Sequence, residues 1–440
     1  MRWALVLRVL NAVALLVINM LLTRIMSPED VGLYFLVMSM VMMLTYLGSF
    51  GLHLAVVRLV AEALGKQLPG RARQIVRKVF FLSGANVIVF GAASLFGGLA
   101  FINNEYYHSE GVERNIPLIV GWVVAWSMQM NFAEILRGLD DIKSAVFFRK
   151  TASSLPILGF LVFLALSSGS TTFENVLVGV VGCWTASSLL AALVMVRKVA
   201  RLKGEGEVGY REIVALSLPL GITSLFTLGM EQADIWILGT TGQMDDVAVY
   251  GAVVRLLRQV LFPLFIITAT IQPVIARLHA QERIQQLERI LRGTATAAML
   301  MGVMMFVWVC ILGKWTLITL FGEHYGAGES ILIILAVGTM FRMIDGTNWM
   351  ALMMMRGERV TMMLSIAYTV AVIVLGIVVV PVYGPIGMAW VMAGTSAIRC
   401  LLHALFIYFR TGMVPLPTFD PRVIWELVAI RSGQRHSQSE

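Results

Sequence analysis

The sequence predicts an all-α, polytopic membrane protein with twelve transmembrane helices in two six-helix lobes. Of its 440 residues, 58% are hydrophobic and only 14% are charged, and the mean hydropathy is +0.82. A soluble domain has about 25% charged residues. The apolar residues also form runs of about 20, which is the length that crosses a bilayer as a helix.

Twelve such runs follow one another with short connections. An even number of spans returns the chain to the side on which it started, so both termini should lie on one side of the membrane. The predicted spans are 4–25, 32–57, 76–102, 116–136, 145–166, 174–196, 213–238, 247–275, 290–312, 329–352, 361–380 and 386–409.

Lysine and arginine are concentrated in alternate loops, which the positive-inside rule assigns to the cytoplasm. The opposite loops hold little beyond Arg24, Arg114 and Lys314. Both termini are therefore expected in the cytoplasm. This loop bias explains the net charge of +8 without nucleic-acid binding, for which no soluble basic domain is present. The three cysteines lie in apolar runs and lack metal-ligand spacing, so no metal site is expected.

The two halves of the chain show an internal repeat. The segment 30–34 (DVGLY) matches 246–250 (DVAVY), and Arg-Gly at 137–138 matches Arg-Gly at 356–357. Both pairs fall at equivalent turns of the two halves, and six spans preserve topology, so the repeat is parallel and substrate would bind between its halves. We predict a lobe over 1–200, a cytoplasmic linker at 201–212, a second lobe over 213–410 and a cytoplasmic tail at 411–440.

Four segments, in this order and spacing, resemble a known family. They are 27–34 (SPEDVGLY), 48–62 (GSFGLHLAVVRLVAE), 320–325 (LFGEHY) and 381–387 (PVYGPIG). Together they resemble the Wzx-type polysaccharide and O-antigen flippases of the multidrug/oligosaccharidyl-lipid/polysaccharide (MOP) exporter superfamily.

This resemblance implies a MATE-like, alternating-access transporter in the bacterial cytoplasmic membrane. The implied substrate is an undecaprenyl-pyrophosphate-linked oligosaccharide for polysaccharide or lipopolysaccharide synthesis, moved from the cytoplasmic to the periplasmic leaflet. Partners would include the lipid bilayer, a polysaccharide polymerase and chain-length proteins. The drug-antiporter branch of the superfamily often has an acidic residue in its first span, whereas the charged residues of this first span are Arg8 and Arg24.

Four arginines lie deep in predicted spans. At the helical rise per residue, Arg255 lies roughly 12 Å, Arg258 roughly 16 Å, and both Arg342 and Arg399 roughly 20 Å from the outer surface. Only Asp345, roughly 24 Å deep, and Glu231 are acids in the same zone. Buried charges of this kind pair as helix-to-helix contacts or line a cavity. Because arginines are in excess, we predict that Arg255, Arg258, Arg342 and Arg399 bind the pyrophosphate.

The span 213–238 has a polar stripe at three- and four-residue steps, which places it on one side of a helix. Its members are Ser217, Gly221, Ser224, Thr227, Glu231 and Asp234. Glu231 is level with Arg255 and Asp345 is one turn from Arg342, so both pairings are plausible. We predict Glu231, Asp234 and Asp345 as coupling residues for H⁺ or Na⁺, with structural ion pairs as the alternative.

Arg8 and Asn19 share a face of the first span and complete the predicted substrate-binding set. Asn19 could equally hydrogen-bond between helices. No Walker A segment is present, so we expect no nucleotide or other cofactor, and transport would use an ion gradient or downstream consumption of substrate.

Three other functions remain open. A drug or cation antiporter predicts an anionic cavity. A membrane-embedded polymerase or glycosyltransferase needs a sizeable loop with acid and base residues, and the loops here are short. A scaffold subunit of a polysaccharide synthase complex is compatible with the sequence.

Overall fold

The computed structural model describes residues 2–167, 170–241, 243–261, 275, 278, 281, 283–354, 358–414 and 416–418. Within these residues the secondary structure consists of helices and turns, without strands. The chain forms two compact units, Met1–Gly251 and Ala252–Glu440.

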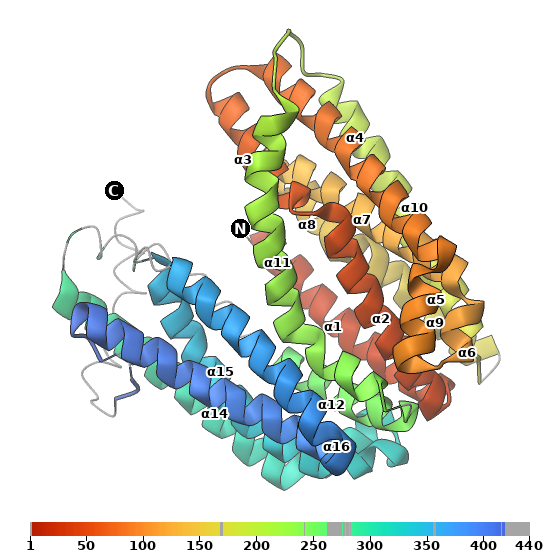
Figure 1. Ribbon diagram of the computed structural model, residues 1–440, viewed down its shortest axis with the longest axis vertical. Helices are drawn as coiled ribbons and strands as arrows, with labels where there is room; N and C mark the ends of the chain where they lie inside the picture. Colours follow the sequence, from red (N-terminus) through yellow and green to blue (C-terminus); the bar gives the residue numbers. More distant parts are fainter. Residues whose placement is uncertain are drawn as a thin grey trace. The chain divides into compact units, whose positions relative to one another are not determined.

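The helices follow one another along the chain as the sequence predicts (Figure 1). Their bounds are α1 (Arg2–Ile25), α2 (Pro28–Ser49), α3 (Leu52–Gly65), α4 (Pro69–Ala93), α5 (Leu99–Ile102), α6 (Glu110–Arg114), α7 (Ile116–Gly138), α8 (Ile142–Val146), α9 (Ala152–Ser167), α10 (Phe173–Val199), α11 (Tyr210–Gly239), α12 (Met244–Val260), α14 (Ile284–Phe321), α15 (Glu329–Met354) and α16 (Glu358–Thr411).

Ten helices of the described chain are long and apolar enough to cross a membrane, which confirms the all-α polytopic fold. The last of them, Val360–Thr411, covers both predicted spans 361–380 and 386–409. It bends at Gly384, whose φ of 57° and ψ of −145° suit a residue without a Cβ. The predicted span 247–275 begins in α12 and continues outside the described residues.

The predicted second span, 32–57, is not one helix. α2 begins at Pro28, where the Ser27 hydroxyl accepts a hydrogen bond from the backbone N–H of Asp30 at 3.2 Å. This cap explains why Ser, Pro and acidic residues stand at the start of α2. α2 ends where Phe50 (φ 43°) and Gly51 (φ 76°) both adopt left-handed backbone, and α3 then starts in a new direction.

The bend between α2 and α3 packs directly against the backbone of α11. A Cβ placed on Gly51 would lie 2.2 Å from the carbonyl oxygen of Ser217, and one on Gly221 would lie 2.8 Å from the carbonyl oxygen of Phe50. The two glycines therefore allow two backbones to touch. The first part of the polar stripe on α11 thus faces protein, since Ser217 and Gly221 are buried in this contact.

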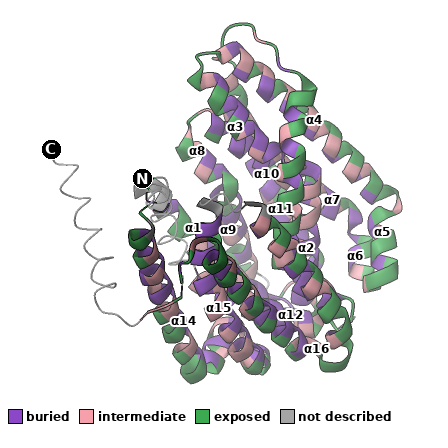
Figure 2. Ribbon diagram, turned by 60° about the vertical axis from the view of Figure 1, so that its left-hand side comes forward, coloured by how far each residue is buried: buried purple, intermediate pink, exposed green. Residues whose placement is uncertain are grey.

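α7 is the central helix of the N-terminal unit and contacts α2, α3, α4 and α10. Most of its residues are buried, including Trp122 and Ile135 (Figure 2). By contrast, α16 in the C-terminal unit exposes large apolar side chains along its length, such as Val382 and Phe409. Such a surface is stable against lipid tails rather than against water.

In the C-terminal unit α15 packs against both α14 and α16. A Cβ on Gly338 would lie 2.7 Å from the Cα of Ala393, so the backbones of α15 and α16 also approach closely.

The division between the compact units falls after Gly251, so α11 belongs to the N-terminal unit, where it packs against α2 and α3. The connection from α10 to α11 covers 200–209. The predicted lobes 1–200 and 213–410, with the linker 201–212 and the tail 411–440, stay predictions.

The segment 30–34 contacts the first residue of α12, two residues before its predicted repeat partner 246–250. A Cβ on Gly32 would lie 1.9 Å from the carbonyl oxygen of Met244, so no larger residue fits there. A pocket of about 570 Å³ adjoins this contact and is lined by residues of both turns, among them Glu29, Asp245 and Asp246. Partial burial and the neighbouring Asp245 raise the pKa of Asp246 above its ordinary value.

Candidate functional site

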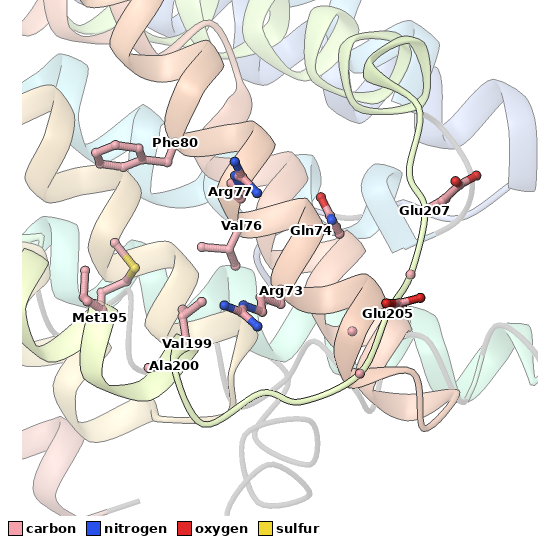
Figure 3. Close-up of a pocket in the computed structure, with 14 residues that line it drawn as sticks. Arg73, Gln74, Val76, Arg77, Phe80, Met195, Val199, Ala200, Glu205 and Glu207 are labelled. Atoms are coloured by element: carbon pink, nitrogen blue, oxygen red, sulfur yellow. The ribbon is translucent and has the colours of Figure 1, made fainter.

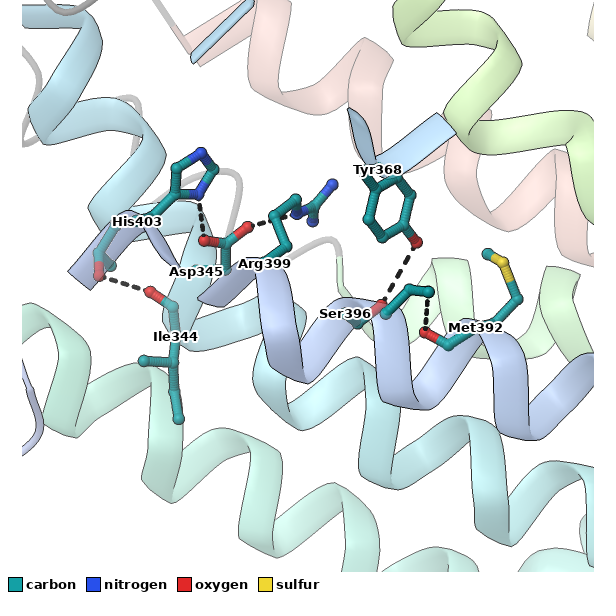
Figure 4. Close-up of polar contacts among 9 residues, drawn as sticks. Ile344, Asp345, Tyr368, Met392, Ser396, Arg399 and His403 are labelled. Atoms are coloured by element: carbon teal, nitrogen blue, oxygen red, sulfur yellow. Dashed lines mark hydrogen bonds and ion pairs between the residues drawn. The ribbon is translucent and has the colours of Figure 1, made fainter. Parts of the chain in front are cut away.

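The candidate functional site is a buried polar cluster between α15 and α16, within the C-terminal unit (Figure 4). Asp345 of α15 is 2% exposed. Its Oδ2 accepts a hydrogen bond from Nε of Arg399 at 2.8 Å, and its Oδ1 lies 2.6 Å from Nδ1 of His403. Arg399 and His403 are four residues apart on α16, so both project from the same face of that helix toward the carboxylate.

An aromatic ring holds the guanidinium of Arg399. Its central carbon lies 4.6 Å from the ring centroid of Tyr368, which comes from the first half of α16. The hydroxyl of Tyr368 in turn lies 3.5 Å from that of Ser396. Arg399 is thus held by both a carboxylate and a π-face, and its two terminal nitrogens are not used in the bond to Asp345.

Several polar groups beside this cluster lack a partner. In the described chain, neither side-chain atom of Asn348 forms a hydrogen bond, and the same is true of Nε2 of His403, although all three atoms are buried. Arg342, one turn before Asp345 on α15, is half-buried and has no hydrogen bond or ion pair with any described residue. Buried polar groups of native proteins are nearly always satisfied, so these groups suit a bound water, ion or polar ligand.

The cluster corrects one predicted pair. Asp345 does not pair with Arg342 on its own helix, because Arg399 and His403 of α16 occupy both of its oxygens. Arg399, predicted to bind substrate, is therefore also a structural partner of Asp345. The excess of positive charge remains, since Asp345 balances only one of the two arginines at this site.

The predicted residues of the first span belong to the N-terminal unit, whereas this cluster belongs to the C-terminal unit. Arg8 is exposed on α1. Asn19 is half-buried and donates from Nδ2 to the carbonyl oxygen of Leu15, one turn earlier in the same helix, at 2.6 Å. α1 forms a hydrogen bond to another helix through Asn11, whose Oδ1 accepts from the Ser154 hydroxyl of α9 at 2.9 Å.

The two acids of α11 have different surroundings. Glu231 is exposed, whereas Asp234 is buried and its Oδ1 accepts a hydrogen bond from the backbone N–H of Ile235 at 2.9 Å. Arg255 and Arg258 lie half-buried on α12, in the C-terminal unit. The pairing of Glu231 with Arg255 and the substrate role of both arginines stay predictions.

Another buried carboxylate lies in the last turns of α7. Glu134 is 2% exposed, and its two oxygens lie 3.4 Å from guanidinium nitrogens of Arg137 and Arg149. The pair with Arg137 follows from their three-residue spacing, whereas Arg149 comes from the irregular turn before α9. Both arginines neutralise this carboxylate, so Glu134 is a structural residue.

Residues 2–279 match the model of a family described as polysaccharide biosynthesis protein. The chain belongs to the polysaccharide biosynthesis protein family. No curated protein sequence matches this chain.

Solved structures share the fold of this polysaccharide biosynthesis protein. An inward-facing multidrug resistance MATE family transporter of the MOP superfamily aligns with a TM-score of 0.79 at 14% identity, over 92% of this chain and 95% of that chain. The lipid II flippase MurJ in an inward closed conformation aligns with a TM-score of 0.74 at 13% identity, over 92% and 87%. A MOP superfamily transporter from Pyrococcus furiosus aligns with a TM-score of 0.62 at 15% identity, over 94% of each chain.

At these identities the likeness shows the fold, and it confirms the predicted MATE-like architecture. This polysaccharide biosynthesis protein is therefore a multi-pass membrane protein with the fold of MOP-superfamily transporters.

The sequence analysis did not identify Tyr368, Asn348 or His403 as members of the cluster. The four-residue spacing of Arg399 and His403 was the available signal, since it places both on one helical face. No sequence signal pointed to Tyr368, because its contact with Arg399 depends on the bend of α16 at Gly384.

Proposed function

We propose that this polysaccharide biosynthesis protein is a flippase. Its substrate would be an undecaprenyl-pyrophosphate-linked oligosaccharide, carried from the cytoplasmic to the periplasmic leaflet of the bacterial cytoplasmic membrane. Family membership supports a lipid-linked glycan as the substrate class. The fold that the chain shares with the lipid II flippase MurJ supports transport of the whole lipid-linked molecule across the bilayer.

The observation that carries the proposal is the uncompensated cation at the cluster on α15 and α16. Arg342 is half-buried in a membrane-spanning helix and has no partner among the described residues. An unpaired guanidinium at this depth is costly unless an anion or water compensates it. A pyrophosphate supplies two or more negative charges and matches the planar donor geometry of arginine.

The alternative within the superfamily is a drug or cation antiporter, such as the MATE transporters of the same fold. That function requires a site that attracts cations, and here four arginines accompany one aspartate in the deep part of the C-terminal unit. The binding pocket of the Pyrococcus furiosus transporter is described as having reverse polarity, which suggests a different function for that protein. The fold is therefore compatible with a binding pocket of either charge. A scaffold role beside a polymerase and chain-length proteins would leave lipid transport by the purified protein at the background rate.

Arg342→Ala is expected to lower surface glycan at least about tenfold while the protein still inserts, because one charge-assisted contact to the pyrophosphate is lost. The measurement is surface glycan in cells with matched amounts of membrane-inserted protein. Arg255→Ala and Arg258→Ala test two further arginines of the predicted set. Arg410→Ala, at the exposed end of α16, is the matched control. Normal glycan in all three test variants would contradict a cationic substrate site.

We further propose that transport is coupled to H⁺ or Na⁺ through Glu231, with Asp234 and Asp345 as further candidates. In proteoliposomes, Glu231→Gln is expected to flatten the dependence of transport on pH or sodium, because the amide neither binds a proton nor carries charge. Glu212→Gln removes a carboxylate at the start of α11 that pairs with Arg71 and serves as the control. If Glu231→Gln keeps the wild-type pH and sodium profiles, Glu231 has no coupling role.

A further inference from the structure

A pocket of about 740 Å³ opens at the end of the N-terminal unit where α4 begins and α10 ends (Figure 3). Its walls are the first turns of α4, the last turns of α10 and the connection 200–209. This end carries the basic loops of the sequence, so the pocket lies where α4 and α10 leave the membrane. It is distant in sequence from every residue of the proposed transport site.

The basic residues at the start of α4 divide into two pairs. Arg71 bonds to Glu212 at 2.6 Å, and Lys78 donates to the carbonyl oxygen of Val208 and lies over the ring of Tyr210. This pair fixes the connection from α10 to α11 on α4. Arg73 and Arg77 instead line the pocket, are exposed, and have no hydrogen bond or ion pair with any described residue.

The position of the connection is well defined. A Cβ on Gly206 would lie 2.4 Å from the backbone nitrogen of Arg71, so the connection lies directly on the first turn of α4. Glu205 and Glu207 also line the pocket, but neither forms an ion pair with Arg73 or Arg77. The two arginines therefore face a space in which no described carboxylate neutralises them.

Apolar side chains continue from the arginines toward the membrane. Arg73, Arg77 and Phe80 lie on one face of α4 at four- and three-residue steps, and Phe80 is 50% exposed. Opposite them, Val196 of α10 is 57% exposed and also lines the pocket. A ligand bound here meets two guanidinium groups at one end and an apolar track at the other.

We propose that this pocket binds an anionic glycerophospholipid of the cytoplasmic leaflet. Its phosphate would lie between Arg73 and Arg77, and its acyl chains would run past Phe80 and Val196 into the bilayer. Arginine suits phosphate because it donates several hydrogen bonds from one rigid plane. The exposed apolar side chains favour a lipid over a free anion, since they give acyl chains a surface to cover.

The test measures binding of phosphatidylglycerol to the purified full-length protein in detergent micelles, with phosphatidylcholine as the neutral lipid. R73Q/R77Q is expected to weaken phosphatidylglycerol binding about 30-fold. This is the loss in affinity expected when two arginines near an anionic lipid surface lose their charge. The double variant R197Q/R201Q removes the same charge from exposed arginines of the same end that do not line the pocket. Its affinity should stay near that of wild type.

Three outcomes of the binding measurements would overturn the proposal. R73Q/R77Q could bind phosphatidylglycerol as wild type does, or R197Q/R201Q could lose binding equally, which would indicate a diffuse charge effect. Soluble glycerol phosphate could bind as tightly as the lipid, which would indicate a simple anion site. A photoreactive phosphatidylglycerol provides an independent measurement, because its acyl chain should cross-link near Phe80 or Val196, and cross-links confined to other helices would contradict the assignment.

Discussion

Asp345→Ala is expected to destabilise the C-terminal unit by about 3–5 kcal/mol, the usual cost of removing one partner from a buried ion pair. The carboxylate is 2% exposed and accepts from Arg399 and contacts His403 at the same time. Its removal leaves the guanidinium of Arg399 over the ring of Tyr368 without its carboxylate partner. Thermal unfolding of the purified protein in detergent measures the loss.

A double-mutant cycle separates the pair from its surroundings. Because Asp345→Ala/Arg399→Ala removes both charges, it should cost clearly less than the sum of the two single changes. Asp345→Asn keeps the shape of the side chain and should fall between wild type and Asp345→Ala. An unfolding midpoint of Asp345→Ala equal to that of wild type would show that the carboxylate is not a buried partner of Arg399.

Gly51→Ala is expected to destabilise the N-terminal unit by about 3 kcal/mol or more, since two costs combine. Residue 51 has a φ of 76°, where a side chain is strained, and the added Cβ would lie 2.2 Å from the backbone oxygen of Ser217. The backbones of the α2–α3 bend and α11 must separate to admit it. Amide hydrogen exchange should therefore become faster around Ser217 as well as at the site of substitution.

Gly182→Ala is the matched control. Gly182 lies in α10, and a Cβ there would meet no atom within 4 Å. Alanine favours a helix over glycine, so this change should be neutral or stabilise by up to about 1 kcal/mol. If Gly51→Ala and Gly182→Ala unfold at the same temperature, the close approach between the bend and α11 does not exist.

The local features of the fold were predictable because they depend on neighbouring residues. α2 starts at a Ser27 cap followed by Pro28, and two acids in its first turn place favourable charge at the helix N-terminus. Pro385 and Gly384 separate the last two predicted spans within α16. The bend at Phe50 and Gly51 was missed, because Phe50 has no preference for left-handed backbone and the contact with α11 holds it there.

The candidate site was predictable in composition but not in pairing. Hydropathy and helical rise placed Arg342, Asp345 and Arg399 deep in the membrane. Depth alone allowed either arginine to reach the aspartate, and proximity along one helix favoured Arg342. The structure pairs Asp345 with Arg399 of α16 instead.

The sequence by itself determined that this is an all-helical membrane protein, the order of its apolar helices, and that its deep charges are mostly cationic. These properties depend on composition, periodicity and the length of apolar runs, which are all local. Only the tertiary structure decided which charges meet. The backbones of α15 and α16 approach closely at Gly338 and Ala393, and this contact sets the face of α16 that Asp345 meets. A helical pattern specifies the face on which a residue lies, whereas packing with another helix selects its partner.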